Sequence, residues 1–150
     1  SSAGTWTDST SSLTWQVTPT GGTMDWSKAK AHCASLSLDG GGWHLPTIGE
    51  LRTLIRGCLA TENGGSCNVE EGDCLAWSCR DFSCKGCNFY GGPGDDGMYW
   101  PDEIQGDCCW YWSSSPVEDT AGNAWVVDFY FGHVSYLTDV PNDNYVRCVR

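Results

Sequence analysis

The residues with the clearest potential for chemistry lie in one acidic, glycine-rich stretch, GGPGDDGMYWPDEIQGD, at residues 91–107. Carboxylate and backbone carbonyl oxygens on a flexible loop are the ligands that Ca²⁺ prefers. A solvated acidic loop without an ion is the simpler alternative, because the spacing of the acids matches no EF-hand loop. The candidate calcium ligands are Asp95, Asp96, Asp102, Glu103 and Asp107.

Aromatic residues supply a second candidate chemistry. Sugars bind with their apolar C–H faces against aromatic rings, while fixed polar groups hold their hydroxyls. The chain contains nine tryptophans and six tyrosines. Those in loops, or on strands of uncertain facing, are candidates for a glycan-binding surface, and local packing is the alternative role: Tyr90, Tyr99, Trp100, Tyr130 and Tyr136.

Catalytic residues are not indicated. Ser113–Ser115, His133 and Asp128 could be drawn as a triad, but no G-x-S-x-G motif supports that arrangement. The even number of cysteines predicts that all are bonded, so none would be a reactive thiolate. We therefore expect no enzymatic activity and no required cofactor.

The ten cysteines are unevenly distributed: nine lie between Cys33 and Cys109, and Cys148 stands alone near the end of the chain. An even count at this density favours five disulfides and an oxidising compartment. Cys148 needs a distant partner, and Cys33, in an early helical segment, is the natural candidate.

Two spacings among the other cysteines need separate interpretation. Cys84-Lys85-Gly86-Cys87 has the C-x-x-C spacing of a zinc or redox motif, but no second pair of this kind exists, so disulfides are favoured over zinc. Cys108 and Cys109 are adjacent, and we expect them to bond to different partners because a bridge between neighbours closes a strained ring. Four bridges of open connectivity would join Cys58, Cys67, Cys74, Cys79, Cys84, Cys87, Cys108 and Cys109.

The net charge of −11 argues against nucleic acid and other polyanions as partners, because these require basic patches. Residues 61–110 carry ten acids and only two bases. No apolar run is long enough to span a membrane. Ser1–Gly4 resembles the start of a mature or trimmed chain, so we expect any signal or anchor segment to be absent from this sequence.

An α+β chain must position these side chains, and we expect it to form a single domain over residues 1–150. Short strands are predicted near residues 5–7 and 13–17. A first helix begins after Asp25, a good N-cap, and residues 39–42 end it. Thr47 and Glu50 form a capping box for a second helix, which ends at Gly57. Its buried face is Ile48, Leu51, Leu54 and Ile55, and its opposite face carries Arg52 and Arg56.

The rest of the chain divides into a cysteine-rich loop and an antiparallel sheet. Residues 57–109 show no periodicity, and disulfides are expected to take the place of a core there. Strands are predicted over residues 110–113, 123–131, 134–138 and 144–150, from their alternation of apolar and polar side chains. In the last of them, Val146 and Cys148 share one face.

Four segments in order carry a family resemblance: WHLPTIGELRTLI, YWSSS, AWVVDFYFGHVSY and YVRCVR. With them the chain, from about Thr5 to Arg150, resembles the family named for the C-terminal domain of the Legionella collagen-like adhesin. The resemblance implies a variant of the C-type-lectin fold, akin to the formylglycine-generating-enzyme branch, in a secreted or surface protein. It also implies a Cys33–Cys148 disulfide, since such domains tie the first helix to the last strand.

The chain departs from the namesake of that family. The namesake is associated with sulfated glycosaminoglycans and with a collagen stalk, whereas this chain is strongly acidic and has no Gly-X-Y repeat, so binding of sulfated polyanions is not carried over. Pro101-Asp102-Glu103 and Asn142-Asp143 echo the E-P-N and W-N-D motifs of calcium lectins, although the tryptophan of the second motif is missing.

These features predict a non-catalytic recognition or adhesion module, secreted or on a bacterial surface, with a neutral glycan as its ligand. A display domain for protein ligands and a structural subunit of an extracellular assembly are the alternatives, and an oligomer is compatible with each. The binding face would combine the cysteine-rich loop with the Asp139–Asn144 loop, where Asn142 and Asp143 are further candidate ligand contacts.

Overall fold

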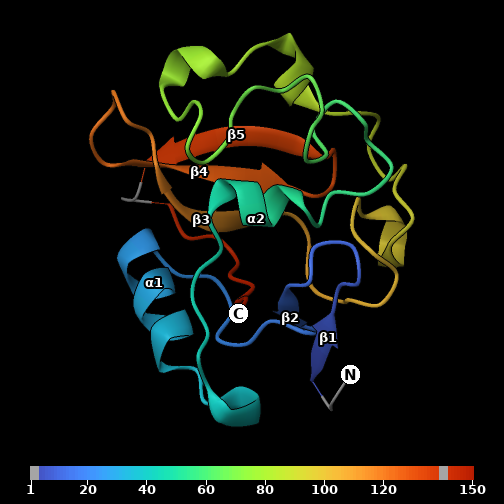
Figure 1. Ribbon diagram of the computed structural model, residues 1–150, viewed down its shortest axis with the longest axis vertical. Coiled ribbons are helices and arrows are strands. Elements are labelled where there is room, and N and C mark those ends of the chain that lie inside the picture. The colour runs from blue at the N-terminus through green and yellow to red at the C-terminus, as the bar shows by residue number, and fades with distance from the viewer. Residues whose placement is uncertain (1–3, 139–141) are drawn as a thin grey trace.

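The protein is an α+β structure built on a three-stranded antiparallel sheet (Figure 1). The computed structural model describes residues 4–138 and 142–150. The sheet contains β3 (Trp110–Pro116), β4 (Asn123–Asp128) and β5 (His133–Thr138), in that order. The α+β class and these three strands are confirmed, although β4 ends at Asp128 rather than at Phe131.

Both faces of the central strand are covered. Every residue of β4 is buried, and its side chains alternate between two core clusters. Trp125 and Val127 belong to one cluster, and Ala124 and Val126 belong to the other. Because successive strand side chains point to opposite faces, the two clusters must lie on the two sides of the sheet.

The two helices lie on these two sides. α1 (Trp26–Ser35) adds Ala29 and Cys33 to one cluster, and the Asp25 side chain accepts a hydrogen bond from the Lys28 backbone as predicted. α2 (Ile48–Arg52) packs on the other cluster, in front of the sheet in Figure 1. No helix in the described part of the chain combines the length and apolar character needed to cross a membrane.

The capping box of α2 is confirmed: Thr47 accepts from the Glu50 backbone, and the Glu50 side chain accepts from the Thr47 backbone. The predicted apolar stripe is buried, but α2 ends at Arg52 and not at Gly57. The placement of Arg52 on an outer face was wrong. Its guanidinium is buried because it donates to the carbonyl oxygens of Thr61, Glu62 and Val69, which fold back over the helix.

The N-terminal hairpin and the final residues close the molecule. β1 (Thr5–Thr7) pairs with β2 (Thr14–Gln16), as predicted for these residues. The segment 144–150 was predicted to be a strand, which was wrong as a continuous element. It contacts several neighbours in turn through isolated bridges, so no single partner strand runs beside it: Met24↔Asn144, Tyr111↔Tyr145, Trp15↔Val149 and His44↔Val149.

The Cys33–Cys148 disulfide is confirmed, and it joins α1 to this final segment. Both residues are fully buried in the same cluster as Val146. Backbone hydrogen bonds between Thr14 and Arg150 in both directions tie the hairpin to the same segment. The first helix, the hairpin and the end of the chain are therefore held together at one place.

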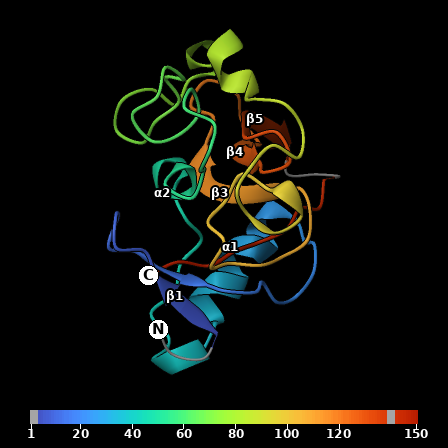
Figure 2. The ribbon, with the colours of Figure 1, turned by 90° about the vertical axis from the view of Figure 1, so that its right-hand side faces the viewer.

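The cysteine-rich loop, residues 57–109, contains only short 3-10 turns: η2 (Trp77–Cys79), η3 (Phe82–Lys85) and η4 (Asp95–Gly97). Another, η1 (Leu38–Gly40), follows α1. In Figure 2 the turns η2 and η3 lie at the end of the molecule opposite the marked termini. Three disulfides are nested inside one another in this loop: Cys58–Cys87 encloses Cys67–Cys84, which encloses Cys74–Cys79.

The expectation that Cys108 and Cys109 bond to different partners was wrong, because they bond to each other. The other eight cysteines pair among themselves, within the nested loop or across the core. The nested set ends at Cys87, and residues 88–107 contain no cysteine. The adjacent pair therefore has no other cysteine left as a partner.

Candidate functional site

An exposed group of aromatic side chains lies where the cysteine-rich loop meets the end of β4. This aromatic group consists of Phe89, Tyr90, Tyr130 and Phe131. Phe89 and Tyr90 are 61% and 54% exposed. The Tyr90 ring meets the Tyr130 ring edge-on at 4.3 Å between centroids, and the Phe89 ring stacks on Tyr130 at 5.8 Å. Such contacts hold the rings in fixed positions while leaving part of each open to solvent.

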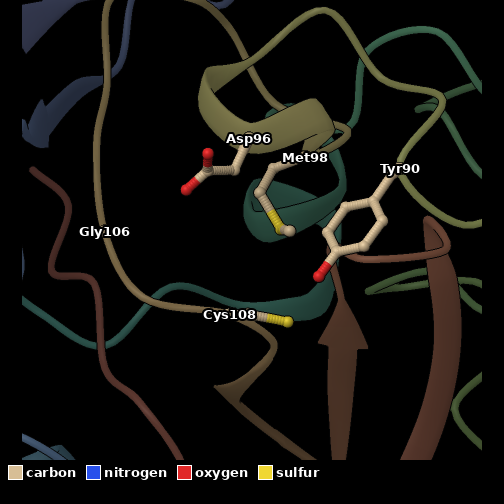
Figure 3. Close-up of a pocket in the computed structure, with 5 residues that line it drawn as sticks. All are labelled: Tyr90, Asp96, Met98, Gly106 and Cys108. Carbon is tan, nitrogen blue, oxygen red and sulfur yellow. The ribbon is translucent and has the colours of Figure 1, made fainter.

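A hollow of about 490 Å³ adjoins this group and is called the Tyr90 pocket here. Its volume is in the range of small-ligand sites. It is lined by Tyr90, Asp96, Met98, Gly106 and Cys108. Figure 3 shows the Tyr90 hydroxyl, the Met98 thioether and the Cys108 sulfur pointing toward one another, with the Asp96 carboxylate nearer Gly106.

The backbone around Tyr90 is fixed by pairing with the chain that follows β4. The Tyr90 N–H donates to the Tyr130 carbonyl at 3.2 Å, and the Cys87 N–H donates to the Phe131 carbonyl at 2.7 Å. The chain then comes back beside the same segment, where the Tyr99 N–H donates to the Phe129 carbonyl at 2.9 Å. Both ends of the loop that carries Asp96 are therefore attached to the central sheet.

Glycines allow that loop to fold tightly on itself. A Cβ atom at Gly92 would lie 2.2 Å from the Met98 carbonyl oxygen, and one at Gly97 would lie 2.6 Å from the Tyr90 carbonyl oxygen. Hydrogen bonds from Gly92 to Gly97 and from Gly94 to Met98 close the turn. The glycine-rich composition thus brings Asp96 and Met98 to the same pocket as Tyr90.

Two further hollows continue from the Tyr90 pocket. One of about 380 Å³ shares Asp96 and Gly106 with it and adds Asp95 and Asp107. Another of about 260 Å³ shares Cys108 and is lined by Asp143. The three hollows adjoin one another through these shared residues, and four acids, Asp95, Asp96, Asp107 and Asp143, line them. Their combined surface is called the acidic face below.

A buried arginine supports the far wall of this face. Arg147 is fully buried and donates to the carbonyl oxygens of Gln16, Val17 and Gln105 at 2.5–2.7 Å. A Cβ atom at Gly106 would lie 2.8 Å from both the Arg147 guanidinium and the Tyr111 hydroxyl, so any side chain there would displace them. Burial lowers the pKa of Arg147 to about 10, which leaves it charged at neutral pH.

Tyr111 completes this support. Its hydroxyl donates to the Asp107 carbonyl at 2.8 Å, and its ring is fully buried. Burial raises its pKa to about 12, so the hydroxyl remains a donor. Arg147 and Tyr111 thereby fix the backbone of residues 105–107 at the rim of the Tyr90 pocket.

Among the predicted glycan-contacting aromatics, Tyr90 and Tyr130 lie at this face. Tyr99 and Trp100 do not, which corrects their assignment to a ligand surface: they are 3% and 0% exposed and pack in the core. The Trp100 ring lies 5.2 Å from Phe129, and the Tyr99 hydroxyl donates to the Asn88 carbonyl. They anchor the loop to the core instead of presenting ring faces to a ligand.

Tyr136 lies apart from the Tyr90 pocket. Its hydroxyl accepts a hydrogen bond from the Trp77 indole, and its ring packs edge-on against Trp125. Asp143 lines the third hollow, and Asn142 is partly buried beside it in sequence. Residues 139–141 of the predicted Asp139–Asn144 binding loop lie outside the described residues.

The five predicted calcium ligands do not converge on one point. Asp95, Asp96 and Asp107 line the acidic face, whereas Asp102 and Glu103 are exposed on the turn between them and do not line these three hollows. Within residues 4–138 and 142–150, one group of at least three potential ligand side chains has ligand atoms within 4.8 Å of one another, and its members are Cys108, Cys109 and Asp128. In the described part of the chain, no three of the five predicted ligands therefore bring their carboxylates within that distance of one another.

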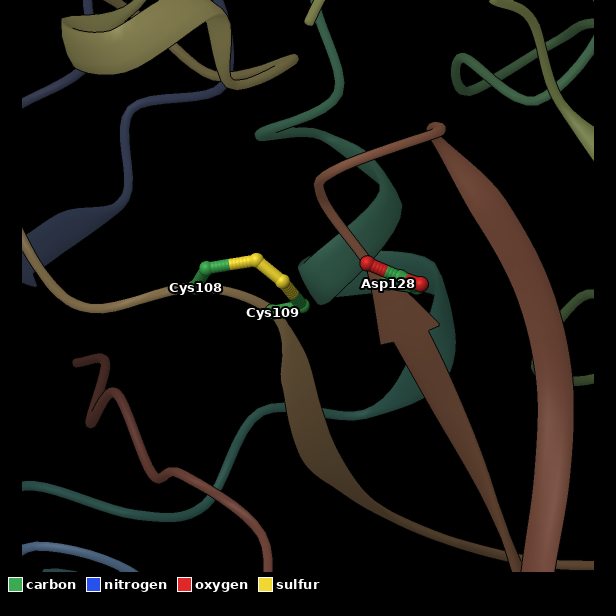
Figure 4. A group of neighbouring side chains, drawn as sticks. All are labelled: Cys108, Cys109 and Asp128. Carbon is green, nitrogen blue, oxygen red and sulfur yellow. A yellow bond between two sulfur atoms is a disulfide. The ribbon is translucent and has the colours of Figure 1, made fainter. Parts of the chain in front are cut away.

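That other group is a disulfide facing a buried carboxyl (Figure 4). Its sulfurs are bonded to each other, so they are not thiolate ligands. Asp128 is 5% exposed and accepts a hydrogen bond from the Tyr130 N–H at 2.9 Å. Burial raises the pKa of its carboxyl. This contact orients Tyr130 beneath Tyr90.

The residues of the triad considered above are engaged elsewhere. The Ser113 hydroxyl is buried and donates to the Trp125 carbonyl at 2.6 Å. His133 Nε2 accepts from the Arg80 guanidinium at 2.9 Å, and burial, together with the charges of Arg80 and Lys85, lowers the His133 pKa to about 4. His133 is therefore neutral and serves as an acceptor.

The sequence did not predict several residues as part of this site: Phe89, Met98, Gly106 and Cys108. Met98 and Cys108 carry no periodic signal, because their neighbours belong to an irregular loop. The glycine-rich composition around Asp95 and Asp96 was the one available hint that the chain turns back on itself there.

The chain matches the model of one protein family over almost its whole length. The model of the Lcl C-terminal domain matches residues 4–150. The chain belongs to this family. Among curated proteins, none matches the chain.

Membership in the Lcl C-terminal domain family indicates an adhesion-related surface domain. The match spans α1, the sheet and the final segment, and therefore both ends of the Cys33–Cys148 disulfide. It also spans the whole cysteine-rich loop and with it the acidic face. The candidate site is thus part of the Lcl C-terminal domain itself.

Proposed function

We propose that this domain is a non-catalytic recognition or adhesion module that binds a glycan at the Tyr90 pocket and the aromatic group beside it. One observation carries the proposal: a fixed, half-exposed Tyr90 ring stands at the edge of a hollow of about 490 Å³ that also contains the Asp96 carboxylate. No catalytic role is needed to account for these residues.

The chemistry of these groups suits a sugar. Aromatic rings can pack against the apolar C–H face of a pyranose, while carboxylates and backbone carbonyls accept from its hydroxyls. Tyr90 and Phe89 supply the rings, and Asp95, Asp96 and Asp107 supply the acceptors. The three adjoining hollows offer room for more than one sugar unit.

We further propose that the fold is a variant of the C-type-lectin fold. The Cys33–Cys148 disulfide between the first helix and the final segment supports this, as does the pairing of Thr14 near the start of the chain with Arg150 at its end. An experimental structure that superposes on such domains in these elements would support the assignment, and a different strand order would contradict it.

The proposed location is extracellular or on the cell surface. Five disulfides among 150 residues are typical of oxidising compartments, and family membership is consistent with the same location. Fractionation of the native host, with the protein recovered outside the cytosol, is the expected result.

A glycan array probed with the wild-type protein, with Tyr90→Ala and with Phe82→Ala tests the function. Phe82 is 82% exposed on η3 and does not line the Tyr90 pocket, so it is a matched aromatic control. We expect binding to a subset of glycans that Tyr90→Ala reduces at least about tenfold and Phe82→Ala leaves intact. Chelator in a parallel array measures any need for calcium. Silence of the wild-type protein across the array would contradict the proposal.

A protein partner is the second candidate, and exposed apolar side chains favour it. Leu59, Phe82 and Phe89 are 81%, 82% and 61% exposed, and exposed apolar side chains mark interaction sites where they join into a patch. If a protein ligand or a structural assembly is involved, Leu59→Ser and Phe82→Ser should abolish adhesion to cells or self-association while glycan binding persists. Size measurement at native concentration separates these two outcomes.

A further inference from the structure

The charge of the Tyr90 pocket limits the kinds of ligand that it can bind. Among its five lining residues, Asp96 is charged and negative, and none is basic. Within the described residues, no hydrogen bond or ion pair engages the Asp96 carboxylate. A carboxylate without a protein partner in a concave site attracts a cation from solvent.

Other lining groups favour an organic cation. The Tyr90 ring is half-exposed, and an ammonium over a tyrosine face is attracted by the ring quadrupole. The Met98 thioether and the Cys108 sulfur are soft and polarisable, and they suit a carbon-bearing ligand better than a hydrated metal ion. Within the described residues, no three of the acids bring their carboxylate oxygens within 4.8 Å of one another.

Residues around the Tyr90 pocket add to its negative charge. Asp95 and Asp107 line the adjoining hollow, so any ligand that extends from the pocket meets further negative charge. The nearest buried cation, Arg147, lies behind Gly106 and donates to three carbonyl oxygens, so it is not presented to the pocket. A sulfated or carboxylated ligand would be repelled here.

We propose that the Tyr90 pocket binds a protonated amine, and that its glycan ligand is an amino sugar whose amine is not acetylated. This inference rests on the proposed function and specifies its ligand. The rings of Phe89 and Tyr90 lie beside the pocket, and two further hollows share lining residues with it. This surface is larger than a single lysine side chain of a protein would cover, which favours a sugar chain.

The test compares two oligosaccharides that differ only in whether their amines carry an acetyl group. Isothermal titration would use tetrasaccharides of β1,4-linked glucosamine and of N-acetylglucosamine, below the pKa of the sugar amine. We expect the glucosamine form to bind about tenfold more tightly, since one exposed carboxylate near an ammonium contributes about this factor. Added salt should reduce the difference, because it screens the charge pair.

Two variants test whether Asp96 causes the preference for the sugar that carries free amines. Asp96→Asn should bring the two affinities to within about twofold, and the loop should persist because asparagine tolerates the left-handed conformation that Asp96 adopts at φ 55°. Glu118→Gln, an exposed acid in the turn between β3 and β4, is the matched control and should keep the full preference. An equal loss in both variants would overturn the assignment to the pocket.

The outcomes separate the two proposals. Equal binding of both tetrasaccharides, or binding of other array glycans without the glucosamine form, would overturn the amine inference and leave the glycan function standing. A silent array together with no titration signal would overturn both. Tighter binding of a lysine-rich peptide than of the glucosamine tetrasaccharide would replace the sugar with a protein ligand.

Discussion

At the scale of single residues, two buried arginines stabilise the fold by donating hydrogen bonds to backbone carbonyls. Arg52 and Arg147 each donate to three backbone carbonyls of irregular segments. Such segments lack a regular ladder, so their carbonyls need other donors. A planar guanidinium with five N–H groups can satisfy several at once.

Replacement of Arg147 should therefore destabilise the whole domain. We predict a loss of about 3–5 kcal/mol of unfolding free energy for Arg147→Ala, because three buried carbonyls lose their donor and a cavity opens beside Trp100. Lys28→Ala, at a position 77% exposed, should cost no more than about 0.5 kcal/mol. Chemical denaturation monitored by tryptophan fluorescence measures both. Equal stability of the two variants would contradict this role for Arg147.

Protonation of His133 should make the free energy of unfolding depend on pH. Its pKa is about 4 in the folded protein, against an ordinary value of 6.5. Between these values the unfolded chain binds a proton that the folded protein does not, so stability falls as the pH is lowered from 6.5 toward 4. His133→Gln should flatten that part of the profile, since glutamine can accept from Arg80 without titrating. An unchanged slope in this variant would assign the pH dependence to other groups.

The residues that sequence analysis misplaced share a physical cause. Tyr99 and Trp100 occur among glycines and acids, and local composition cannot reveal that Phe129 and Arg147 meet them from distant parts of the chain. Arg52 was placed on an outer face by helical spacing alone, while the cover provided by residues 61–69 is a long-range event. In contrast, Tyr90, Asp95 and Asp96 could be found from sequence because their loop is exposed.

At the scale of elements, local signals predicted most of the fold. The Asp25 cap and the Thr47–Glu50 box depend only on neighbouring residues and were confirmed. The strand alternation in β4 was also confirmed, because it reflects two clusters on the two sides of the sheet. The final segment was not a regular strand, since its hydrogen bonds are divided among several partners, and nothing in its own sequence reveals that division.

Four of the five disulfides divide into one that closes the core and three nested ones that order the loop, and the fifth joins the adjacent Cys108 and Cys109. Cys33–Cys148 spans 115 residues and Cys74–Cys79 spans 5. Loop-closure entropy then predicts a loss of about 5 kcal/mol for the Cys33→Ala/Cys148→Ala double variant. The same relation gives about 2 kcal/mol for Cys74→Ala/Cys79→Ala.

Denaturation of the two double variants measures this difference. The first should unfold at a much lower denaturant concentration, whereas the second should keep a native core and the aromatic group. Closely matched losses would show that the nested bridges support the core as strongly as the bridge to the final segment does. Residues 88–107 should remain ordered in the second variant, because their backbone is attached to residues 129–131.

At the scale of the whole molecule, charge and shape act together. The net charge is −11, and the acids Asp95, Asp96 and Asp107 line the acidic face. The buried Arg147 contributes no exposed positive charge there. The molecule therefore presents an anionic, aromatic-edged surface on a core closed by its own termini. An amine-bearing sugar matches that surface in charge and in contact chemistry.

The most direct test of this account is hydrogen–deuterium exchange of the protein with and without the tightest glycan found on the array. The account predicts slowed exchange confined to the backbone of residues 88–98 and 104–110, which surround the Tyr90 pocket, and no such change in Tyr90→Ala. Slowed exchange centred instead on β5 and η2, around Tyr136 and Trp77, would contradict the assignment of the acidic face as the binding surface.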